Sequence, residues 1–284
     1  MLIIYAIAAL GLIGLLFGLF LAIAARVFAV KTDPKVDAVK EALPGANCGA
    51  CGYAGCVNFA EAVVQGDAKP DGCIPGGDET VKAIAEILGQ EVSASAQPVA
   101  TVFCIGDCYK TADKFVYDGV KDCAVAGDFY GGFKTCSYGC LGFGNCVRVC
   151  PFDAIRMGEH ELPVVDPEKC TGCGLCAEAC PRDIIQMLPA GDQGHLVLCS
   201  SHDRGKAVSR ACDVGCIACK LCVKACPQEA IEMDDFLAVI DLEKCDDCGE
   251  CVKVCKPGTI HRRSAIPSEE EAKEAAAEKV SESA

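Results

Sequence analysis

An unbroken apolar segment opens the chain. Residues 2–25 carry no charge, and a helix over them is roughly 36 Å long at about 1.5 Å per residue, enough to span a bilayer. A secretory signal peptide is the alternative, but no cation precedes the segment and a signal core is only about 7–15 residues long. We therefore expect an uncleaved, single-pass transmembrane anchor over residues 1–30.

Positive charge follows this segment and does not precede it. Because positive charge stays on the cytoplasmic side, we expect the rest of the chain in the cytoplasm and the anchor in the inner (cytoplasmic) membrane. The cations are Arg26, Lys31, Lys35 and Lys40.

Helical periodicity marks residues 31–91. Asp33, followed by a proline, is typical of a helix start. Further helices are expected over residues 57–64 and from a cap at Asp78 to an end at Gly89. These signals predict a small helical module.

Two segments show no large apolar face. Residues 92–101 are small and polar with one proline, so residues 92–135 are expected to be a linker and connecting segment. Residues 267–284 consist largely of Glu, Ala, Lys and Ser and are expected to form a disordered acidic tail.

Between these segments the chain repeats itself. A Cys-x3-Cys pair ends each of four stretches, and an isoleucine stands five residues after each pair. The phrase VDPEKC at residues 165–170 recurs as IDLEKC at residues 240–245. The repeat predicts two tandem, related units over residues 136–190 and 191–266.

Cysteine is unusually frequent, with 25 among 284 residues. That density is otherwise typical of short disulfide scaffolds. Here the thiols fall in runs within a long chain that we expect in a reducing compartment. Such runs favour metal ligation and exclude an ordinary enzyme with incidental thiols.

Two of these runs match the bacterial ferredoxin pattern C-x2-C-x2-C-x3-C-P, in which three close thiolates hold one [4Fe–4S] cluster and the fourth ligates its neighbour. They consist of Cys170, Cys173, Cys176 and Cys180, and of Cys216, Cys219, Cys222 and Cys226. A third run has the same spacing with its proline one residue later. It consists of Cys245, Cys248, Cys251 and Cys255.

The first run, Cys136-x3-Cys140-x5-Cys146-x3-Cys150, departs from this pattern. Phe143 stands where the other runs have their middle thiol, and Cys136 is expected to replace that thiol from upstream. Crossed ligation then predicts four clusters in an α+β fold of two double-cluster ferredoxin-like units of βαβ type. The sets are Cys136/Cys140/Cys146/Cys180, Cys170/Cys173/Cys176/Cys150, Cys216/Cys219/Cys222/Cys255 and Cys245/Cys248/Cys251/Cys226.

The helical module carries a separate motif, C-x2-C-x4-C-x16-C. It predicts a fifth [4Fe–4S] cluster, and zinc is the alternative because the motif stands alone. Zinc is less favoured in the ferredoxin runs, since structural zinc sites need no third thiol and no following proline. The four ligands of the module are Cys48, Cys51, Cys56 and Cys73.

Five further cysteines remain: Cys104, Cys108, Cys123, Cys199 and Cys212. Four of them could hold a sixth cluster, and the preferred set is Cys104, Cys123, Cys199 and Cys212. The alternative is that they are buried free thiols, which behave as small hydrophobes. The sequence leaves the count open between five clusters and six.

The net charge of the chain limits the classes of molecule that it can bind. The formal net charge of −14 disfavours nucleic-acid binding, whose footprint is basic. An acidic carrier that docks on this chain needs a local cationic patch. The candidates are Arg204, Lys206 and Arg210, and separately Arg262 and Arg263.

No motif for substrate chemistry is evident. The chain has no GxGxxG in a strand–helix context, no P-loop and no HExxH. No nucleophile–base constellation stands out, so we expect no catalytic residues.

The order of parts resembles the B subunit of the Rnf/Rsx complexes, the ion-translocating ferredoxin:NAD+ oxidoreductases. The resemblance rests on the single apolar N-terminal helix, the C-x2-C-x4-C-x16-C module and the double-cluster units, and covers residues 1 to about 262. Its most specific local match is CSYGCLGFGNC at residues 136–146.

The resemblance implies an electron-transfer subunit of a translocase. It would accept low-potential electrons from soluble ferredoxin and pass them to other membrane subunits, with NAD and the pumped ion bound elsewhere. The alternative is an electron-entry polyferredoxin of another membrane enzyme, such as a hydrogenase or quinone reductase. A corrinoid protein or a structural zinc protein is a further alternative.

Overall fold

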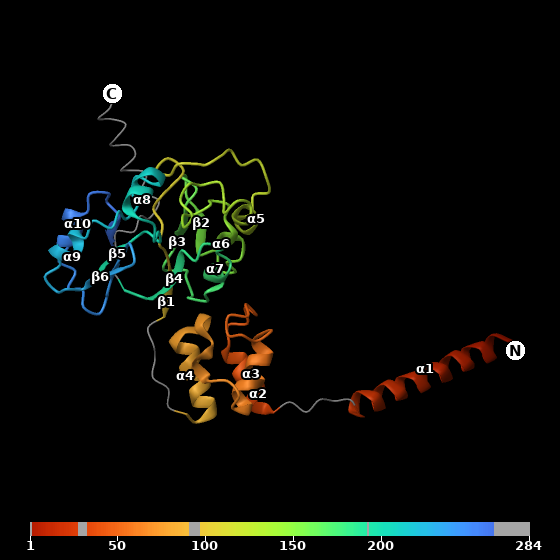
Figure 1. Cartoon of the computed structure of the whole chain (residues 1–284). Coiled ribbons are helices and arrows are strands. Elements are labelled where there is room, and N and C mark those ends of the chain that lie inside the picture. Colours follow the sequence, from red (N-terminus) through yellow and green to blue (C-terminus); the bar gives the residue numbers. More distant parts are fainter. Residues whose placement is uncertain (1, 28–32, 91–96, 192, 264–284) are drawn as a thin grey trace.

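The computed structural model describes residues 2–27, 33–90, 97–191 and 193–263. Figure 1 shows its elements in chain order. The helices are α1 (Leu2–Val27), α2 (Pro34–Ala42), α3 (Cys56–Gln65), α4 (Gly77–Leu88), α5 (Cys123–Asp128), α6 (Asn145–Arg148), α7 (Leu175–Glu178), α8 (Gly205–Ala211), α9 (Leu221–Ala225) and α10 (Glu250–Val254), with short 3-10 turns η1 (Pro70–Gly72) and η2 (Ile74–Gly76). The strands are β1 (Pro98–Val102), β2 (Ile155–Met157), β3 (Pro163–Val165), β4 (Ile185–Pro189), β5 (His195–Val197), β6 (Ile231–Asp234), β7 (Leu237–Ile240) and β8 (Ile260–Arg262).

The apolar N-terminal segment forms α1. Of its side chains, the structure describes Tyr5 and residues 10–24, and those of residues 10–23 are exposed. Within the part of the chain that the structure describes, no helix combines the length and the apolar character that crossing a bilayer requires. The transmembrane assignment stays a prediction.

The three helices of the N-terminal module form as expected. Asp33 caps α2 by accepting a hydrogen bond of 2.9 Å from the Lys35 amide, and α4 ends at Gly89 in the left-handed conformation. One detail differs, because α4 begins at Gly77 and Asp78 lies in its first turn, where its charge favours the helix dipole. The helices pack around Val39, Phe59 and Ile84.

Two similar units follow. Unit one contains β1, α6, β2, β3, α7 and β4 in chain order, and unit two contains β5, α9, β6, β7, α10 and β8. Each unit has an inner hairpin, β2–β3 or β6–β7, and an outer antiparallel pair, β1–β4 or β5–β8. The repeat predicted from the sequence is confirmed in detail, because the four repeated isoleucines open strands and are buried. They are Ile155, Ile185, Ile231 and Ile260.

The expected linker is corrected at residues 98–102, which form β1. This strand pairs with β4 over five residues, from Pro98 with Pro189 to Val102 with Ile185. Ala100 and Val102 are buried in the core of unit one. The short strand escaped sequence reasoning because its residues are small, it begins with proline, and its partner lies far along the chain. The rest of the expected linker before residue 97, and the expected tail at 267–284, lie outside the described residues.

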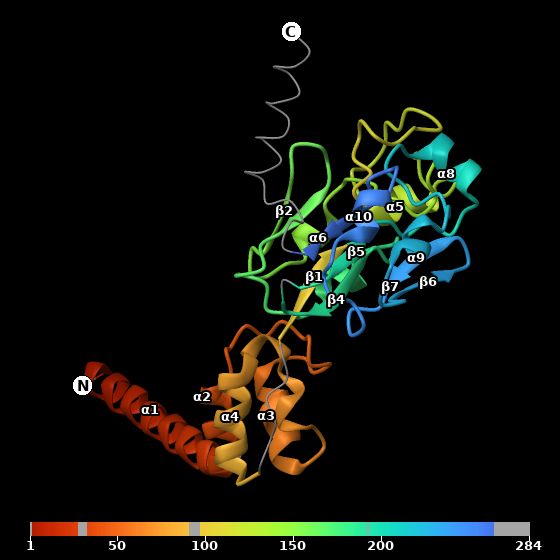
Figure 2. The same ribbon diagram turned by 90° about the vertical axis from the view of Figure 1, so that its left-hand side faces the viewer.

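The two units lie side by side, and the outer pair β1–β4 is on the side of the helical module (Figures 1 and 2). The segment between β1 and α6 of unit one contacts unit two through its backbone. Thr111 forms an isolated bridge with Cys212, and the Ala112 amide donates to the Ala211 carbonyl (3.0 Å). The segment thereby fixes α8 against unit one.

Candidate metal centres

Most cysteines gather in groups of four around small cavities. The group of the helical module lines a cavity of about 320 Å³, and the two groups of unit two line cavities of about 370 and 270 Å³. All three groups have the predicted composition, including the crossed fourth cysteine in unit two. They are Cys48/Cys51/Cys56/Cys73, Cys216/Cys219/Cys222/Cys255 and Cys226/Cys245/Cys248/Cys251.

One group of unit one also forms as expected, from Cys150, Cys170, Cys173 and Cys176. Burial, and then the charges of neighbouring thiols that include Cys150 and Cys170, raises the pKa of Cys173. Burial, together with Cys170 and Cys173, raises the pKa of Cys176 to about 12. These thiols therefore lie near one another, and Cys48 of the helical module also lies near enough to Cys173 to raise its pKa.

The other group of unit one differs from the group predicted from the sequence. A cavity of about 370 Å³ is lined by Cys123, Cys140, Cys146 and Cys180, and Cys136 is not among its lining residues. Cys123 is the first residue of α5. The fourth cysteine of this group therefore lies further upstream in the chain than the sequence analysis places it.

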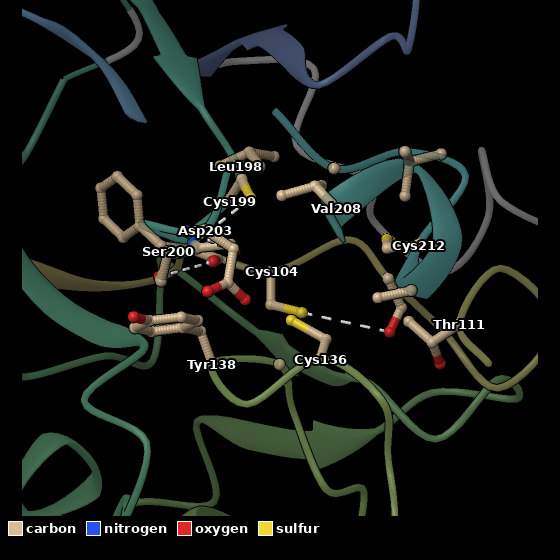
Figure 3. Close-up of a pocket in the computed structure, with 17 residues that line it drawn as sticks. Cys104, Thr111, Cys136, Tyr138, Leu198, Cys199, Ser200, Asp203, Val208 and Cys212 are labelled. Atoms are coloured by element: carbon tan, nitrogen blue, oxygen red, sulfur yellow. Dashed lines mark hydrogen bonds between the residues drawn. The ribbon is translucent and has the colours of Figure 1, made fainter. Parts of the chain in front are cut away.

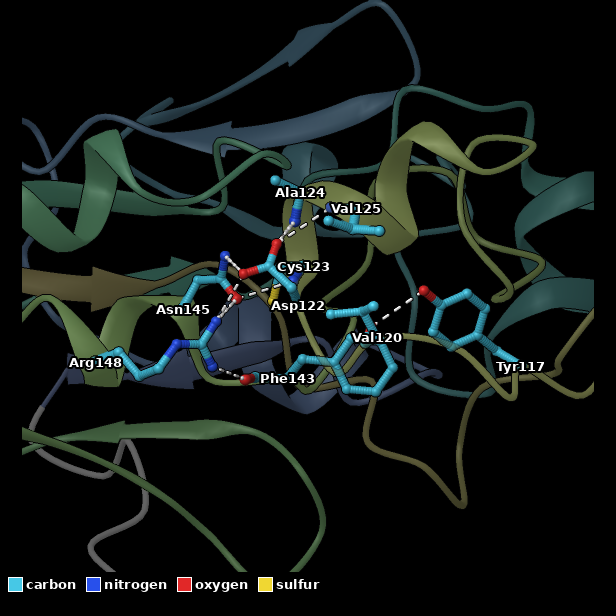
Figure 4. Close-up of polar contacts among 9 residues, drawn as sticks. All are labelled: Tyr117, Val120, Asp122, Cys123, Ala124, Val125, Phe143, Asn145 and Arg148. Atoms are coloured by element: carbon cyan, nitrogen blue, oxygen red, sulfur yellow. Dashed lines mark hydrogen bonds and ion pairs between the residues drawn. The ribbon is translucent and has the colours of Figure 1, made fainter.

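A polar network holds Cys123 at this position (Figure 4). The Asn145 side chain accepts a hydrogen bond from the Cys123 amide at 2.8 Å and donates one to Asp122 at 2.9 Å. Arg148 donates to both Asn145 and Asp122, at 2.6 and 2.8 Å. Asp122 in turn caps α5 by accepting from the Ala124 amide.

The signal for this arrangement lies at Asn145 itself. The corresponding residues of the other three runs, each directly before the third cysteine, are Leu175, Leu221 and Glu250. Of these four residues, Asn145 has the amide side chain, and its oxygen accepts a hydrogen bond from the backbone of a cysteine of another segment. Sequence reasoning missed it because no single position in a repeat stands out by itself.

The spare cysteines are placed differently from the preferred sixth set. Cys104, Cys199 and Cys212 line a cavity of about 450 Å³ together with Cys136, and Cys123 is not part of it. Thus Cys123 and Cys136 exchange the roles that the sequence analysis gave them. Cys108 is exposed and lines none of these cavities.

The grouped sulfurs accept hydrogen bonds from the backbone. Such N–H···S bonds stabilise the thiolate form that ligates metal. Among the predicted ferredoxin-type ligands, Cys170, Cys226 and Cys255 accept one each, at 3.3–3.4 Å. The donors are the amides of Ala100, Ala230 and Thr259, so strand β1 contributes directly to a site of unit one.

The spacing of the thiols separates two metal chemistries. A tetrahedral zinc ion with Zn–S bonds of about 2.3 Å draws its sulfurs to within about 4 Å of one another. Among the described residues, the one group of three or more ligand atoms that all lie within 4.8 Å is His202, Asp234 and Asp235. In the described part of the chain, no cysteine group therefore has three sulfurs as close together as a single zinc ion would draw them.

The predicted docking cations divide into two kinds. Arg262 forms an ion pair with Asp247, and Arg263 donates to the Pro189 carbonyl, so both serve packing within the described chain. The three cations of the α8 region, Arg204, Lys206 and Arg210, are exposed.

Comparison with known families agrees with this division of the chain. A family described as "Putative Fe-S cluster" matches residues 43–75. The family described as "4Fe-4S dicluster domain" matches residues 136–187, and a second family with the same description matches residues 215–259. The dicluster interpretation of the two units is thereby supported, while Cys104, Cys123, Cys199 and Cys212 lie outside the matched ranges.

Whole-chain comparison finds close relatives. The chain is 49% identical over 88% of its length to the B subunit of the Na(+)-translocating ferredoxin:NAD(+) oxidoreductase complex of Acetobacterium woodii, covering 75% of that protein. It is 45% identical over 90% of its length to the B subunit of the ion-translocating oxidoreductase complex of Methanosarcina acetivorans, covering 97%. It is 46% identical over 88% of its length to the B subunit of the proton-translocating ferredoxin:NAD(+) oxidoreductase complex of Clostridium ljungdahlii, covering 88%. The chain thus belongs to the family of B subunits of ion-translocating oxidoreductase complexes, the Rnf family, and is an iron–sulfur electron-transfer subunit.

Proposed function

We propose that this subunit accepts low-potential electrons from reduced ferredoxin and passes them to the membrane subunits of its complex through five [4Fe–4S] clusters. The observation that carries the proposal is the presence of five groups of four cysteines, four of which each line one cavity. The ligand sets are Cys48/Cys51/Cys56/Cys73, Cys123/Cys140/Cys146/Cys180, Cys150/Cys170/Cys173/Cys176, Cys216/Cys219/Cys222/Cys255 and Cys226/Cys245/Cys248/Cys251.

A [4Fe–4S] cluster supplies a one-electron carrier whose potential depends on burial and on hydrogen bonds to its sulfurs. The chain's own residues set both of these quantities. Cys146, Cys176, Cys222 and Cys251 are buried, whereas Cys219 and Cys248 of the unit-two groups are exposed. The amides that bind Cys170, Cys226 and Cys255 supply fixed dipoles directed at sulfur.

We infer that neighbouring groups form a relay. Cys48 of the helical module is among the thiols whose charges, after burial, raise the pKa of Cys173 in unit one. Cys146 acts in the same way on Cys176 of the adjacent group. The helical module therefore provides one end of a path into unit one.

We also propose, from the sequence alone, that the uncharged N-terminal segment anchors this path to the membrane. Its residues from Leu2 onwards carry no charge until Arg26. The cations that follow would hold the cluster-bearing units on the cytoplasmic side of the inner membrane. In this proposal NAD and the translocated ion bind to other subunits.

The docking surface proposed for ferredoxin is the exposed face of α8 and the residue before it. An acidic carrier is repelled by a chain of net charge −14 unless it meets a local cationic patch. Arg204, Lys206 and Arg210 are exposed there. On the opposite face of α8, Val208 and Ala211 line a cysteine cavity. A carrier bound to α8 would thus lie near a cysteine group.

Charge reversal tests the docking surface. We expect R204E/K206E/R210E in the anaerobically purified full chain to slow reduction by ferredoxin at least tenfold at low salt, with less effect at high salt. The matched control is K35E/K40E/K82E, which makes the same change of charge at exposed positions of the helical module. An equal effect of both triple variants would assign the result to net charge and reject the patch.

The function itself is tested by metal analysis and reduction of the same protein. We expect at least about 20 iron and 20 sulfide per chain, little zinc, and full bleaching of the cluster absorbance by reduced ferredoxin. Stoichiometric zinc with little iron, or clusters that reduced ferredoxin leaves oxidised, would reject the proposal.

A further inference from the structure

A sixth group of four cysteines lies between the two units. Cys104 and Cys136 approach from the side of unit one, and Cys199 and Cys212 from the side of unit two (Figure 3). All four cysteines line one cavity of about 450 Å³, just as the cysteines of two ferredoxin-type groups line theirs.

The two units contribute to this group symmetrically. Cys104 follows β1 in the phrase Val-x-Cys, and Cys199 follows β5 in the same phrase. Cys136 begins Cys-x2-Gly-Cys, and so does Cys212. Each unit thus supplies the thiol that follows its first strand and the thiol that lies four residues before Cys140 or Cys216. Incidental buried cysteines would not show this correspondence.

Hydrogen bonds join the group to a ligand of each unit. The Cys140 amide donates to Cys104 Sγ at 3.5 Å, and the Cys216 amide donates to Cys199 Sγ at 3.4 Å. The Ser201 amide also donates to Cys199 Sγ, at 3.5 Å. These donors are backbone amides, as at the ferredoxin-type sulfurs. The Cys140–Cys104 and Cys216–Cys199 hydrogen bonds occupy equivalent places in the two units.

Glycines keep the space beside the sulfurs open. A side-chain carbon added at Gly106 would lie 3.0 Å from Cys212 Sγ. Carbons added at Gly139 and Gly215 would lie 3.5 Å from Cys136 Sγ and 3.7 Å from Cys212 Sγ. All three glycines line the cavity, and the last two stand at the same position of the repeated Cys-x2-Gly-Cys phrase.

We propose that the interface between the two units holds a sixth [4Fe–4S] cluster, bound by Cys104, Cys136, Cys199 and Cys212. This inference rests on the proposed function of the other five groups and extends it. The sixth centre links the group that contains Cys140 to the group that contains Cys216, because a single hydrogen bond leads from it to each. It turns two separate double-cluster units into one continuous relay.

Metal analysis of the anaerobically purified full chain tests the site without depending on any variant. We expect about 24 iron and 24 sulfide per chain. About 20 of each would mean that the interface holds no cluster, while the proposed function would stand. Little iron with stoichiometric zinc would overturn both proposals.

Double variants identify the ligands. Cys136→Ala combined with Cys199→Ala removes two ligands of one site and should cost about four iron. Cys123→Ala combined with Cys199→Ala strikes two different sites and should cost about eight. The sequence-based assignment of Cys123 to the sixth set gives the reverse result, which would overturn the ligand set proposed here.

Cys108→Ala is the matched control, because Cys108 is exposed and belongs to no group. We expect it to retain all iron and the wild-type electron paramagnetic resonance spectrum after reduction. Cys199→Ala should lose one spin per chain in that spectrum while keeping the remaining signals. A wild-type spectrum in Cys199→Ala would contradict the site even if total iron varied between preparations.

Discussion

Replacement of Asn145 by leucine tests how unit one holds a ligand that comes from outside its run. Leucine is the residue found at the same repeat position in two other runs, as Leu175 and Leu221. The change preserves volume approximately and removes the amide that accepts from the Cys123 backbone at 2.8 Å.

The magnitude follows from the contacts. Loss of this half-buried hydrogen bond costs about 1 kcal/mol, and an unpaired backbone N–H adds about 1–2 kcal/mol. The bonds of Asn145 to Asp122 and Arg148 add little, because both partners reach water. The total of roughly 2–3 kcal/mol corresponds to a factor of about 30–150 in the equilibrium that keeps Cys123 in its site.

The assay is the release of iron to a ferrous chelator under anaerobic conditions. We expect about four of the iron atoms in Asn145→Leu to leave more than tenfold faster than in the wild type, with the remainder unchanged. The control is Glu250→Leu, the same substitution at the equivalent position of the fourth run, where the side chain pairs with Lys253 on the surface. Release curves of Asn145→Leu that coincide with those of the wild type would refute the tethering role.

Three further outcomes are expected. Gly172 has a φ of +74°, and the methyl group of Gly172→Ala would meet the Pro98 carbonyl, so this variant should lose about 2–4 kcal/mol of unfolding free energy in denaturant titrations. The control is Gly174→Ala, which has a φ of +81° but open space around it and should lose only about 1 kcal/mol. Equal losses in the two variants would contradict the steric argument. Burial raises the pKa of Asp107, but hydrogen bonds from Lys110 and the Tyr109 amide outweigh burial and lower that pKa from its ordinary value of 3.8. Asp107→Asn should therefore lower the melting temperature at pH 7, and the difference from the wild type should shrink as the pH falls through the folded-state pKa. A difference in melting temperature that grows on acidification would contradict this prediction. Removal of the metal should expose residues 98–263 to limited proteolysis, because the thiolate–metal bonds supply much of the folding energy of such small units, and an apo-protein that resists protease like the holo-protein would show otherwise.

Local sequence signals predict much of the architecture. The repeated cysteines and isoleucines locate both units, since thiol spacing along one loop determines which sulfurs can converge. The same is true of the helical module, where Asp33 and Gly89 mark helix ends as expected. Features that depend on residues close together in the sequence can therefore be predicted from it.

Features that depend on contacts between residues far apart in the sequence cannot be predicted in this way. Strand β1 is stabilised by β4, which lies far along the chain, and Cys123 reaches its site only through the network around Asn145. Because Phe143 leaves the first run one thiol short, the nearest upstream thiol, Cys136, is the substitute that spacing favours. The repeated Cys-x2-Gly-Cys motif argues against this substitution. Its second copy begins at Cys212, and the run that follows it has all four cysteines without Cys212.

The pairing of the first strand with the last in each unit has an evolutionary consequence. Because β1 meets β4 and β5 meets β8, the chain leaves each unit close to where it entered. A duplicated unit can then be added without separating the paired strands of the unit before it, so such chains can grow by whole modules. If each new boundary between modules also carries the Val-x-Cys and Cys-x2-Gly-Cys phrases, every added module brings its own two centres and one more at the junction.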